Sequence, residues 1–425
     1  MNYLQSIEYL ESFKRFGIHL GLGRIRNLLS SLGNPHKKFK SIHIAGTNGK
    51  GSVCAILSSI LNAEGYKVGL YTSPHLVDYT ERIRIKEKDI DQKRFAKAVD
   101  AVKKAVNRSH IKGLTEFELL TAVAFLIFAQ EKVDVAVVET GMGGRLDATN
   151  VVVPLASVVT NVELEHTEIL GKTVARIAKE KAGIIKRKVP VVTWENKKEA
   201  LSVIRKACVV QKASLININK SSGVKIANFQ DKGKNGSKFD LAWRLGKIKG
   251  VVFSLNGRAQ IRNLETALAV LVLMSKTLPI NKDALARGLS KVNWPARLQT
   301  ISRDIMVDSA HNPSGAKFLR HYLVSLKKKI TFIIGMQNDK DFVEFIDILA
   351  PVAKMFIVTR SSHSDARDPS EFVRHIRARK KEVRVGSSVG SSLRMAKEFA
   401  GGIICITGSI YLVGDYLKYR RAETN

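Results

Sequence analysis

The stretch at residues 41–52, SIHIAGTNGKGS, decides how the rest of the chain is interpreted. Residues 42–45 form a short apolar run typical of a buried strand, and residues 53–61 follow with a strongly apolar helical pattern. Between them lies a glycine-rich turn. A strand, a glycine-rich loop and a helix in this order surround phosphate with backbone N–H groups and a helix N-terminus. The residues of the expected nucleotide-binding loop are Gly46, Thr47, Asn48, Gly49, Lys50, Gly51 and Ser52.

The residue types in this loop suit phosphate chemistry. Glycines leave room where the backbone curls around an anion. Lys50 supplies a positive charge, and Ser52 supplies a hydroxyl suited to Mg²⁺. The match to the pattern G-x-x-x-x-G-K-[ST] is imperfect, because the spacing before Lys50 is shorter and Gly51 separates the lysine from the serine. A glycine-rich turn that binds no phosphate is the alternative interpretation.

Polar residues stand at the ends of three further strand patterns. Ser73 follows one strand, Glu139 ends the next, and His166 follows a third. The carboxyl ends of parallel strands share one rim of a doubly wound sheet, so we expect these three side chains to meet at a Mg²⁺ beside the phosphate loop. A serine turn and an isolated structural histidine are the simpler alternatives for Ser73 and His166.

The charge of the chain is unusually basic. In 425 residues there are 70 Lys and Arg against 38 Asp and Glu, a net charge of +32. The basic residues are spread along the chain without a basic strand interleaved with aromatic residues, so we do not expect a nucleic-acid partner. No apolar run approaches the ~20 residues of a membrane span. The three distant cysteines, Cys54, Cys208 and Cys405, indicate a reducing environment, and we expect a cytoplasmic protein with no membrane partner.

The chain reads as two α/β domains. Residues 1–294 alternate strands and helices, and we expect a P-loop ATPase domain with a mostly parallel sheet. Residues 217–240 are polar and predict a loop with weak strands. The sequence NWPAR at 293–297 predicts a linker, and residues 297–425 predict a smaller, Rossmann-like α/β domain.

Ten motifs in order along nearly the whole chain carry a family resemblance. They are HIAGTNGKGS, YTSPHL, ERIRI, TEFE, GMGGRLDATN, HTEILG, EKAGIIK, WPARLQ, AHNP and TGSIYLVG. Together they resemble the bacterial folylpolyglutamate synthase/dihydrofolate synthase family, within the ATP-dependent Mur ligase superfamily. The resemblance implies that a carboxylate attacks the γ-phosphate of ATP to give an acyl phosphate, which the α-amino group of L-glutamate then attacks. The carboxylate would belong to dihydropteroate or to the γ-glutamyl tail of a reduced folate.

The resemblance also assigns roles to individual residues. Ser73, Glu139 and His166 match the family's Mg²⁺ ligands, and Lys181 matches a lysine carried as a carbamate. With Lys50, the residues Glu139, His166 and Lys181 form the expected catalytic set. Further expected contacts are to ATP from Asn263, Arg297 and Asp308, to pteroate from Thr115, Glu116, Phe117, Glu118, Leu146, Asp147 and Ala148, and to glutamate from His311, Ser409 and Tyr411. A monovalent cation such as K⁺ and a monomeric state are further expectations from the family.

The chain departs from the family pattern at four positions. Glu165 stands where the family usually has Asp, Ala296 and Ser309 stand where it commonly has Gly, and Gly23 stands where an acid is frequent. The last departure bears on the pteroate end of the site, and therefore on the dihydrofolate synthase activity.

Two alternative functions stay open from the sequence. One is a ligase of the same superfamily that adds an amino acid to a cell-wall nucleotide precursor, although TEFE and GRLDATN argue against it. The other is a basic P-loop protein that binds nucleic acid, which would bind RNA or DNA with a steep dependence on salt and without glutamate-dependent ATP hydrolysis.

Overall fold

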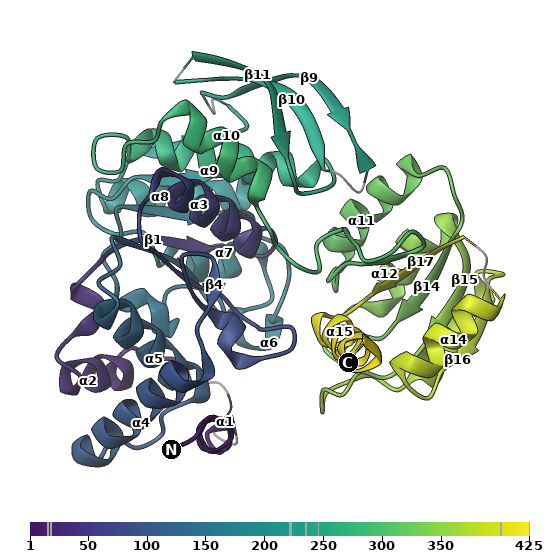
Figure 1. Cartoon of the computed structure of the whole chain (residues 1–425), viewed down its shortest axis with the longest axis horizontal. Coiled ribbons are helices and arrows are strands. Elements are labelled where there is room, and N and C mark those ends of the chain that lie inside the picture. The colour runs from purple at the N-terminus through teal and green to yellow at the C-terminus, as the bar shows by residue number, and fades with distance from the viewer. Residues whose placement is uncertain are drawn as a thin grey trace. The chain divides into compact units, whose positions relative to one another are not determined.

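The computed structural model describes residues 1–14, 17, 19–220, 223–233, 236–244, 246–399 and 402–424. The chain divides into two compact units (Figure 1). The first comprises Met1–Phe229, Lys238–Phe253 and Gln260–Val292, and the second comprises Gln230–Ser237, Ser254–Ala259 and Asn293–Asn425. The short segments 230–237 and 254–259 thus group with the second unit, whereas the sequence predicts them within the first domain.

The first unit is built on an eight-stranded sheet with β1 (Lys40–Ala45) near its centre. β1 pairs in parallel with β5 (Val135–Glu139) on one side and with β6 (Ala156–Val159) on the other. β2 (Val68–Tyr71) pairs in parallel with β5. The order is β4-β3-β2-β5-β1-β6-β7-β8, with β3 and β4 antiparallel at one edge. The remaining strands are β3 (Ile83–Ile85), β4 (Lys88–Asp89), β7 (Val191–Thr193) and β8 (Leu215–Asn217).

Helices cover both faces of this sheet. α3 (Lys50–Glu64) contacts β1, β2 and β5 and packs closely on α10 (Lys282–Lys291), where a Cβ atom on Gly288 would lie 2.6 Å from Ile60 Cα. The helices α4 (Gln92–Ser109) and α5 (Glu116–Gln130) pack on each other. The other helices are α1 (Tyr3–Glu11), α2 (Gly23–Ser31), α6 (Thr167–Leu170), α7 (Val174–Ala182), α8 (Lys198–Val210) and α9 (Ala259–Leu273), and short 3₁₀ turns lie at Pro35–Lys37, Tyr79–Arg82 and Ala148–Val151.

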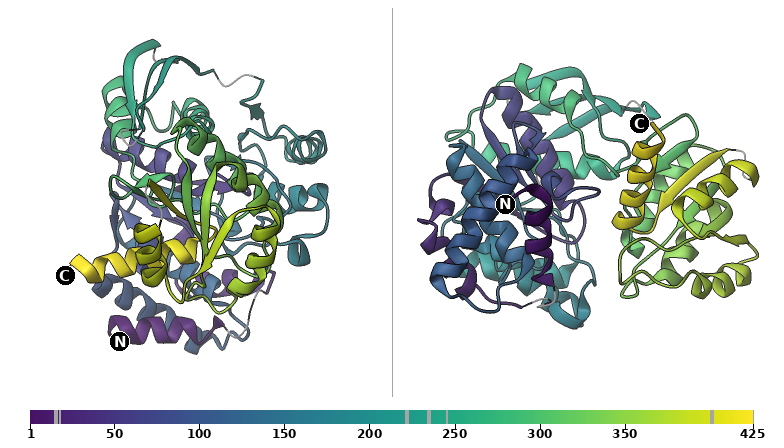
Figure 2. Two further views of the ribbon diagram at one scale, coloured as in Figure 1. Left: turned by 90° about the vertical axis from the view of Figure 1, so that its right-hand side faces the viewer. Right: turned by 60° about the horizontal axis from the view of Figure 1, so that its bottom comes forward.

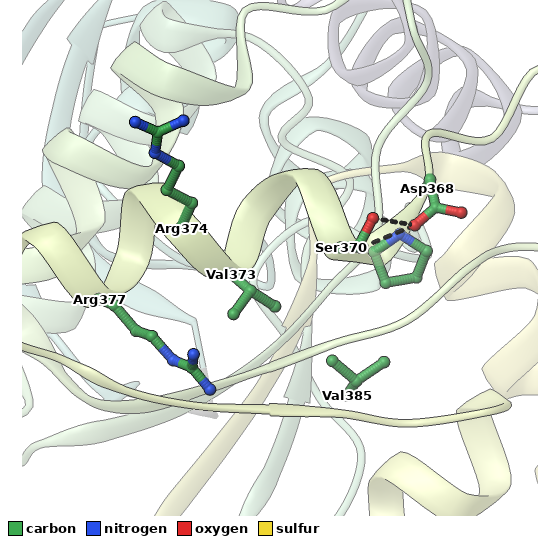
Figure 3. A pocket seen from close by; sticks show the side chains of 7 residues that line it. Asp368, Ser370, Val373, Arg374, Arg377 and Val385 are labelled. Carbon is green, nitrogen blue, oxygen red and sulfur yellow. Dashed lines mark hydrogen bonds between the residues drawn. The ribbon is translucent and has the colours of Figure 1, made fainter.

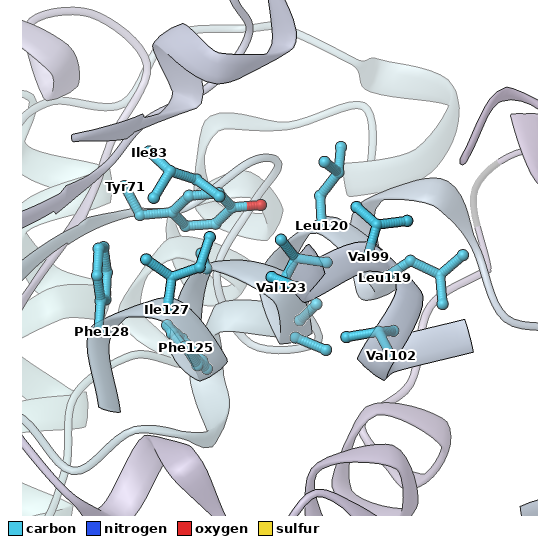
Figure 4. Packing of buried hydrophobic residues seen from close by; sticks show 14 of the residues in the cluster. Tyr71, Ile83, Val99, Val102, Leu119, Leu120, Val123, Phe125, Ile127 and Phe128 are labelled. Atoms are coloured by element: carbon cyan, nitrogen blue, oxygen red, sulfur yellow. The ribbon is translucent and has the colours of Figure 1, made fainter. Parts of the chain in front are cut away.

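The apolar spacing of α4 explains its part of the core beside β2. Phe95, Val99, Val102 and Val106 recur on one face of α4, and all four are buried. They belong to a cluster with the side chains of α5 and with Tyr71 of β2 (Figure 4). α1 packs on α4 and α5 at the outside of this layer (Figure 2).

A separate three-stranded sheet follows β8 along the chain. Its strands lie in the order β11-β10-β9. In the middle strand alternate residues are buried, among them Phe239, Leu241 and Trp243, so one face of the strand carries the apolar side chains. Strands therefore form in part of the stretch at 217–240, where the polar composition predicts a loop with weak strands. Their bounds are β9 (Lys225–Asp231), β10 (Ser237–Trp243) and β11 (Gly246–Phe253).

The second unit contains a six-stranded sheet in the order β12-β13-β17-β14-β15-β16, parallel except for β12. The rings of Phe332 and Phe356 stack in its core with centroids 5.4 Å apart. The strands are β12 (Gln299–Thr300), β13 (Ile305–Val307), β14 (Ile330–Ile334), β15 (Ala353–Val358), β16 (Glu382–Val385) and β17 (Ile403–Thr407). The helices are α11 (Pro313–Ser325), α12 (Phe342–Leu349), α13 (Pro369–Ala378), α14 (Val389–Phe399) and α15 (Ile410–Thr424), with a 3₁₀ turn at Ala350–Val352.

Within the described residues, no helix has both the length and the apolar character needed to cross a membrane. The expected fold class, a P-loop unit with a mostly parallel sheet and a smaller α/β unit, is confirmed.

Candidate active site

The glycine-rich loop runs from the end of β1 into the N-terminus of α3, as the sequence predicts. Gly49 has a left-handed backbone (φ 83°) and directly precedes Lys50, the first residue of α3. A Cβ atom on Gly46, where φ is +148°, would lie 1.7 Å from Thr160 Oγ1. A Cβ atom on Gly49 would lie 2.4 Å from Asn263 Oδ1, which places the predicted nucleotide contact Asn263 against the loop. Only glycine fits where the loop backbone approaches these neighbours so closely.

Asn161, just past β6, holds the loop in place. Its carbonyl oxygen accepts a hydrogen bond from Thr47 N (2.9 Å), and its Oδ1 accepts one from Asn48 N (2.8 Å). Thr47 Oγ1 in turn accepts a hydrogen bond from Glu163 N at 3.0 Å. Lys50 Nζ donates to two carbonyl oxygens of the loop, at 2.9 and 3.2 Å. The loop is therefore tied to the end of β6, and the Lys50 ammonium lies over the turn that the phosphates would occupy.

The strand order brings the predicted magnesium ligands to one rim. β2, β5, β1 and β6 are consecutive neighbours, and they lead to Ser73, Glu139, the phosphate loop and His166 respectively. Ser73 N donates to Glu139 Oε2 at 3.4 Å, and Glu139 is 5% exposed. Burial raises the pKa of the Cys54 thiol on α3; nearby Glu139 raises it further, whereas Lys50 opposes the rise. Glu139 and Lys50 therefore both lie close enough to Cys54 on α3 to act on its thiol electrostatically.

The donor set at this rim fits a hard cation in part. A hydroxyl and a carboxylate are oxygen donors of the kind that Mg²⁺ prefers, and an imidazole adds a nitrogen. His166 directly precedes α6 and has a left-handed backbone (φ 47°), in the segment that follows β6. Among the described residues, no three His, Cys, Asp or Glu side chains gather as a metal-binding group. With Glu139 and His166 alone the expected Mg²⁺ site has two ligands, so a third protein ligand would have to be the hydroxyl of Ser73.

A buried ion pair lies beside this rim. Lys181 Nζ on α7 is 2.6 Å from Glu165 Oε1, and the two side chains are 1% and 11% exposed. Burial by itself would raise the pKa of Glu165, but Lys181, Lys50 and His166 lower it to about 2. Burial lowers the pKa of Lys181, the ion pair with Glu165 opposes this, and Lys50 lowers it further. The structure therefore brings Lys50, His166 and Lys181 into one electrostatic neighbourhood around Glu165.

The first predicted pteroate segment begins α5 and has a clear structural role. Thr115 caps the helix, and Glu118 Oε2 accepts hydrogen bonds from Thr115 N (2.8 Å) and Thr115 Oγ1 (3.1 Å). Glu118 is buried and pairs with Arg24 Nε at 3.2 Å. Gly23 directly precedes this arginine. The position where the family frequently has an acid is thus next to a cation that already neutralises Glu118.

The other residues of this segment face aromatic and glycine neighbours. Tyr79 Oη donates to Glu116 Oε1 at 2.5 Å. The ring of Phe117 stacks on Tyr71 with centroids 6.1 Å apart. A Cβ atom on Gly141 would lie 2.6 Å from the same ring. Phe117 therefore reaches from α5 to the loop that follows β5.

The second predicted pteroate segment, residues 146–148, lies at the end of that loop. Asp147 is buried, and its carboxylate accepts hydrogen bonds from Met142 N (2.9 Å) and Thr149 N (3.0 Å) and one from the Thr149 hydroxyl. Thr149 Oγ1 is also 2.8 Å from Nε2 of the buried His43. Burial raises the pKa of Asp147, and the hydrogen bonds from Thr149 and Met142 oppose that shift. Asp147 therefore fixes the shape of the loop.

The same loop is fastened to α7, the helix that carries Lys181. Arg145 N donates to the carbonyl oxygen of Glu180 at 2.7 Å. A Cβ atom on Gly144 would lie 2.9 Å from the carbonyl oxygens of both Glu180 and Lys181. The glycines of GMGG thus allow the loop backbone to pack on the helix backbone, which couples the predicted pteroate loop to Lys181.

Comparisons with known proteins place the chain in one family. The Mur ligase middle domain family matches residues 44–271, and the C-terminal domain of dihydrofolate synthetase matches residues 291–419. The folylpolyglutamate synthase of Lacticaseibacillus casei is 37% identical over 358 residues, which cover 82% of this chain and 83% of that protein. The dihydrofolate synthase/folylpolyglutamate synthase of Bacillus subtilis is 32% identical over 98% of both chains. E. coli FolC in complex with DHPP and ADP has a TM-score of 0.89 at 29% identity, and the alignment covers 100% of this chain and 99% of that one.

The chain belongs to the folylpolyglutamate synthase/dihydrofolate synthase family of Mur ligases. It is therefore an ATP-dependent ligase that joins glutamate to folates. The family resemblance seen in the ordered motifs is confirmed. The assignment of individual residues to ligands stays a prediction.

The family's expected glutamate and nucleotide contacts in the second unit lie at the ends of neighbouring strands. After β13, Asp308 is buried, and its carboxylate accepts hydrogen bonds from Leu298 N (2.9 Å) and Ala310 N (2.9 Å). Burial raises the pKa of Asp308, and nearby Arg297 opposes the shift. Asp308 thus fixes the turn that carries Arg297, in addition to its predicted contact with the nucleotide.

The predicted glutamate residues share the same edge of the second sheet. His311 follows β13, and its Nδ1 is 2.9 Å from the carbonyl oxygen of Ser309. Ser409 follows β17; its hydroxyl accepts a hydrogen bond from Gln337 Nε2 (2.8 Å) after β14 and one from Tyr411 N (3.1 Å). Because β13, β17 and β14 are neighbours, the structure brings these strand-end residues together.

Two residues important to the ligase site escape sequence reasoning. Asn161 carries no motif, and its one signal is its place just past a parallel strand. Glu195 is 1% exposed, and its carboxylate accepts hydrogen bonds from Val162 N (2.5 Å), Asn196 N (2.8 Å) and Lys197 N (2.7 Å). It holds the strand-end segment that leads to His166. Its position two residues after β7 is again the only signal.

A groove elsewhere in the second unit contains none of the predicted site residues. It has a volume of about 500 Å³ between α13 and the edge strand β16 (Figure 3). Asp368 accepts hydrogen bonds from Ser370 N (2.8 Å) and Ser370 Oγ (2.6 Å) and so caps α13. The groove is lined by Asp368, Pro369, Ser370, Val373, Arg374, Arg377 and Val385.

Proposed function

We propose that this ligase joins L-glutamate to dihydropteroate, to the γ-carboxylate of reduced folates carrying γ-glutamyl tails, or to both. The acid's carboxylate oxygen attacks the γ-phosphorus of ATP, and the bond to ADP breaks, which gives an acyl phosphate. The neutral α-amino group of glutamate then attacks the acyl carbon, and the tetrahedral intermediate collapses with loss of phosphate and a proton. The observation that carries the proposal is the gathering of Lys50, Lys181 and the strand ends of β2, β5 and β6 beside the phosphate loop.

The loop and Lys50 act by positioning charge. Phosphoryl transfer needs aligned groups and neutralisation of the phosphate oxygens more than covalent help. Lys50 Nζ is now bonded to loop carbonyl oxygens at 2.9 and 3.2 Å, and these bonds can be exchanged for bonds to β- and γ-phosphate oxygens with little movement. Asn263, against Gly49, is suited to contact the nucleotide from the same unit.

Ser73, Glu139 and His166 would hold Mg²⁺ at this rim. When bound, Mg²⁺ neutralises phosphate oxygens in the transfer. The Ser73 N–H group donates to the Glu139 carboxylate and so orients it toward the loop. We place a monovalent cation such as K⁺ among the cofactors on family grounds alone.

Lys181 is proposed to react with CO₂ and act as a carbamate. The reaction requires the neutral amine, and burial lowers the pKa of Lys181, which favours that form. The product is an anion, so the ion pair with Glu165 must then give way to contacts with a cation. Lys181 lies on α7, and Arg145 N of the loop at residues 145–147 donates a hydrogen bond to the neighbouring Glu180 carbonyl oxygen. The carbamate would therefore have a fixed position relative to the pteroate segment.

The remaining roles complete the proposal. Residues 115–118 and 146–148 form the pteroate side, Arg297 and Asp308 contact the nucleotide, and His311, Ser409 and Tyr411 bind glutamate. We further propose a cytoplasmic monomer that acts on small molecules and not on nucleic acid. Three buried cysteines without disulfide bonds among the described residues agree with a reducing compartment.

A side-by-side assay tests the proposal. Purified protein is supplied with ATP, Mg²⁺, L-glutamate and one acceptor, and ADP release is measured. The acceptors are dihydropteroate, tetrahydrofolate, which carries one glutamate, and tetrahydrofolate diglutamate. Glutamate-dependent ADP release with one or more of these acceptors is expected. Turnover only with a UDP-linked cell-wall precursor would overturn it, and so would ATP hydrolysis that depends on RNA or DNA and not on glutamate.

A further inference from the structure

A groove beside the proposed site has no role in the functions described so far. It has a volume of about 430 Å³ and lies between α6, α7 and Arg145, which belongs to the loop that follows β5. All of its residues belong to the first unit. It is lined by Arg145, Ile169, Leu170, Gly171, Arg176, Lys179 and Glu180.

The groove carries an excess of positive charge. Arg145 binds the Glu180 carboxylate with Nη2 2.9 Å and Nε 3.0 Å from Oε1, so these two charges offset each other. Arg176 and Lys179 lie one turn apart on the same exposed face of α7, and within the described part of the chain neither has an acidic partner. A ligand in this groove therefore meets two cationic side chains that have no carboxylate of their own.

The backbone limits where the Arg176 side chain can lie. Gly171 has a left-handed backbone (φ +103°), and a Cβ atom there would lie 2.9 Å from both Cβ and Cδ of Arg176. The aliphatic part of the arginine thus rests on the glycine backbone. Ile169 and Leu170 add an apolar wall, with Ile169 36% exposed. The groove combines two cations with a short apolar surface, which suits a chain of methylene groups that bears carboxylates.

The walls come from the two loops that the proposed function uses. Arg145 directly precedes residues 146–148 of the pteroate segment, and α6 directly follows the proposed metal ligand His166. α7 forms the third side and carries Lys181 on its buried face. The groove is therefore lined by residues next in sequence to both the proposed pteroate segment and the proposed metal ligand.

We propose that this groove binds the α-carboxylates of the γ-glutamyl tail when the tail has more than one residue. The inference rests on the proposed function. Each added glutamate leaves one α-carboxylate unreacted, and Arg176 and Lys179 are placed to receive these groups while the terminal γ-carboxylate reacts. A substrate with a single glutamate, or dihydropteroate with none, does not reach the groove.

The test compares acceptor lengths in a double variant. In Arg176→Gln/Lys179→Gln, the KM for tetrahydrofolate triglutamate is expected to rise about three- to tenfold, as for the loss of two exposed ion pairs. The KM for the monoglutamate and for dihydropteroate, and kcat for all three, are expected to stay unchanged. The matched control Arg205→Gln/Lys206→Gln removes the same two charges from the exposed face of α8 and should change none of these values.

Two outcomes would overturn the inference. One is a KM for the triglutamate that is equal in the double variant and the control, and the other is a KM that rises equally for all acceptors. A wild-type enzyme that is inactive on every folate acceptor would instead refute the proposed function. If the wild type turns over dihydropteroate alone, titration of the triglutamate against intrinsic fluorescence decides the question, and binding no tighter than that of the monoglutamate rejects the groove.

Discussion

Lys181 Nζ lies 2.6 Å from Glu165 Oε1, and Lys181 is completely shielded from solvent at 1% exposure. The family usually has Asp where this chain has Glu165, and the longer side chain reaches the lysine. A buried cation without a partner would be costly, so the carboxylate holds Lys181 in place. Burial still lowers the pKa of Lys181, and this shift favours the neutral amine that a reaction with CO₂ requires.

Removal of the Lys181 amine should therefore abolish ligase activity, and a small carboxylic acid should restore part of that activity. Lys181→Ala is expected to lose most ligase activity, and added formate or acetate is expected to restore part of it by supplying a carboxylate in the vacated space. ADP release with and without the added acid measures the effect. Lys206→Ala, on the exposed face of α8, serves as the control and should respond to neither. Normal activity of Lys181→Ala without added acid would exclude the carbamate.

Lys50 should be essential for turnover but not for folding. Its ammonium donates hydrogen bonds to two carbonyl oxygens of its own loop, so Lys50→Ala removes two partly buried hydrogen bonds. We expect kcat/KM to fall by roughly 10³-fold or more, as for the loss of a charge that acts in the transition state. Thermal unfolding followed by circular dichroism should shift by only a few degrees. A variant that keeps a tenth of the activity would contradict the phosphate-loop assignment.

Gly46 should tolerate no side chain because two separate effects oppose it. In Gly46→Ala the new Cβ atom meets Thr160 Oγ1 at 1.7 Å, and the backbone has φ +148°. Gly65, with φ +109° and no atom within 4 Å of a Cβ, isolates the backbone effect. We expect Gly65→Ala to lower the free energy of unfolding by about 1–2 kcal/mol and Gly46→Ala by clearly more, with loss of nucleotide binding. Denaturant unfolding of both variants, with ADP titration, checks this, and equal losses would show that the clash is relieved.

His43 should make the stability of the first unit depend on pH. Burial first, and then Lys186, lower its pKa to about 3, against 6.5 for an unperturbed histidine. Below pH 6.5 the unfolded chain binds a proton that the folded chain does not, so stability falls as the pH drops from 6.5 toward 3. At pH 5 this amounts to about 2 kcal/mol.

The measurement is urea unfolding at pH 7.5 and pH 5 in the wild type and in His43→Gln, which keeps a group able to hydrogen-bond Thr149. The wild type should lose about 2 kcal/mol more than the variant between the two pH values. His375, which is partly exposed, provides a control, and His375→Gln should keep the wild-type dependence that arises from His43. An identical pH dependence in the His43 variant would show that His43 is protonated in the folded chain.

Much of this protein follows from its sequence. The spacing of glycines after a short apolar run predicts the phosphate loop, and the apolar patterns on either side of it predict β1 and α3. Alternating strands and helices predict a parallel sheet, and the rule that strand ends share a rim predicts that Ser73, Glu139 and His166 meet. The ordered motifs identify the family.

Other features were decided only by the tertiary structure. The polar stretch around residues 217–240 forms strands because alternate residues such as Phe239 and Leu241 find a buried face, which composition does not reveal. Asn161 and Glu195 support the site because their side chains accept hydrogen bonds from backbone N–H groups that are distant in sequence. The reach of Glu165 to Lys181, and the groove formed by Arg145, Arg176 and Lys179, depend on how α7 packs against two loops. The sequence determines which chemical groups are present and which strand ends carry them, whereas packing alone brings each group within contact distance of its partners.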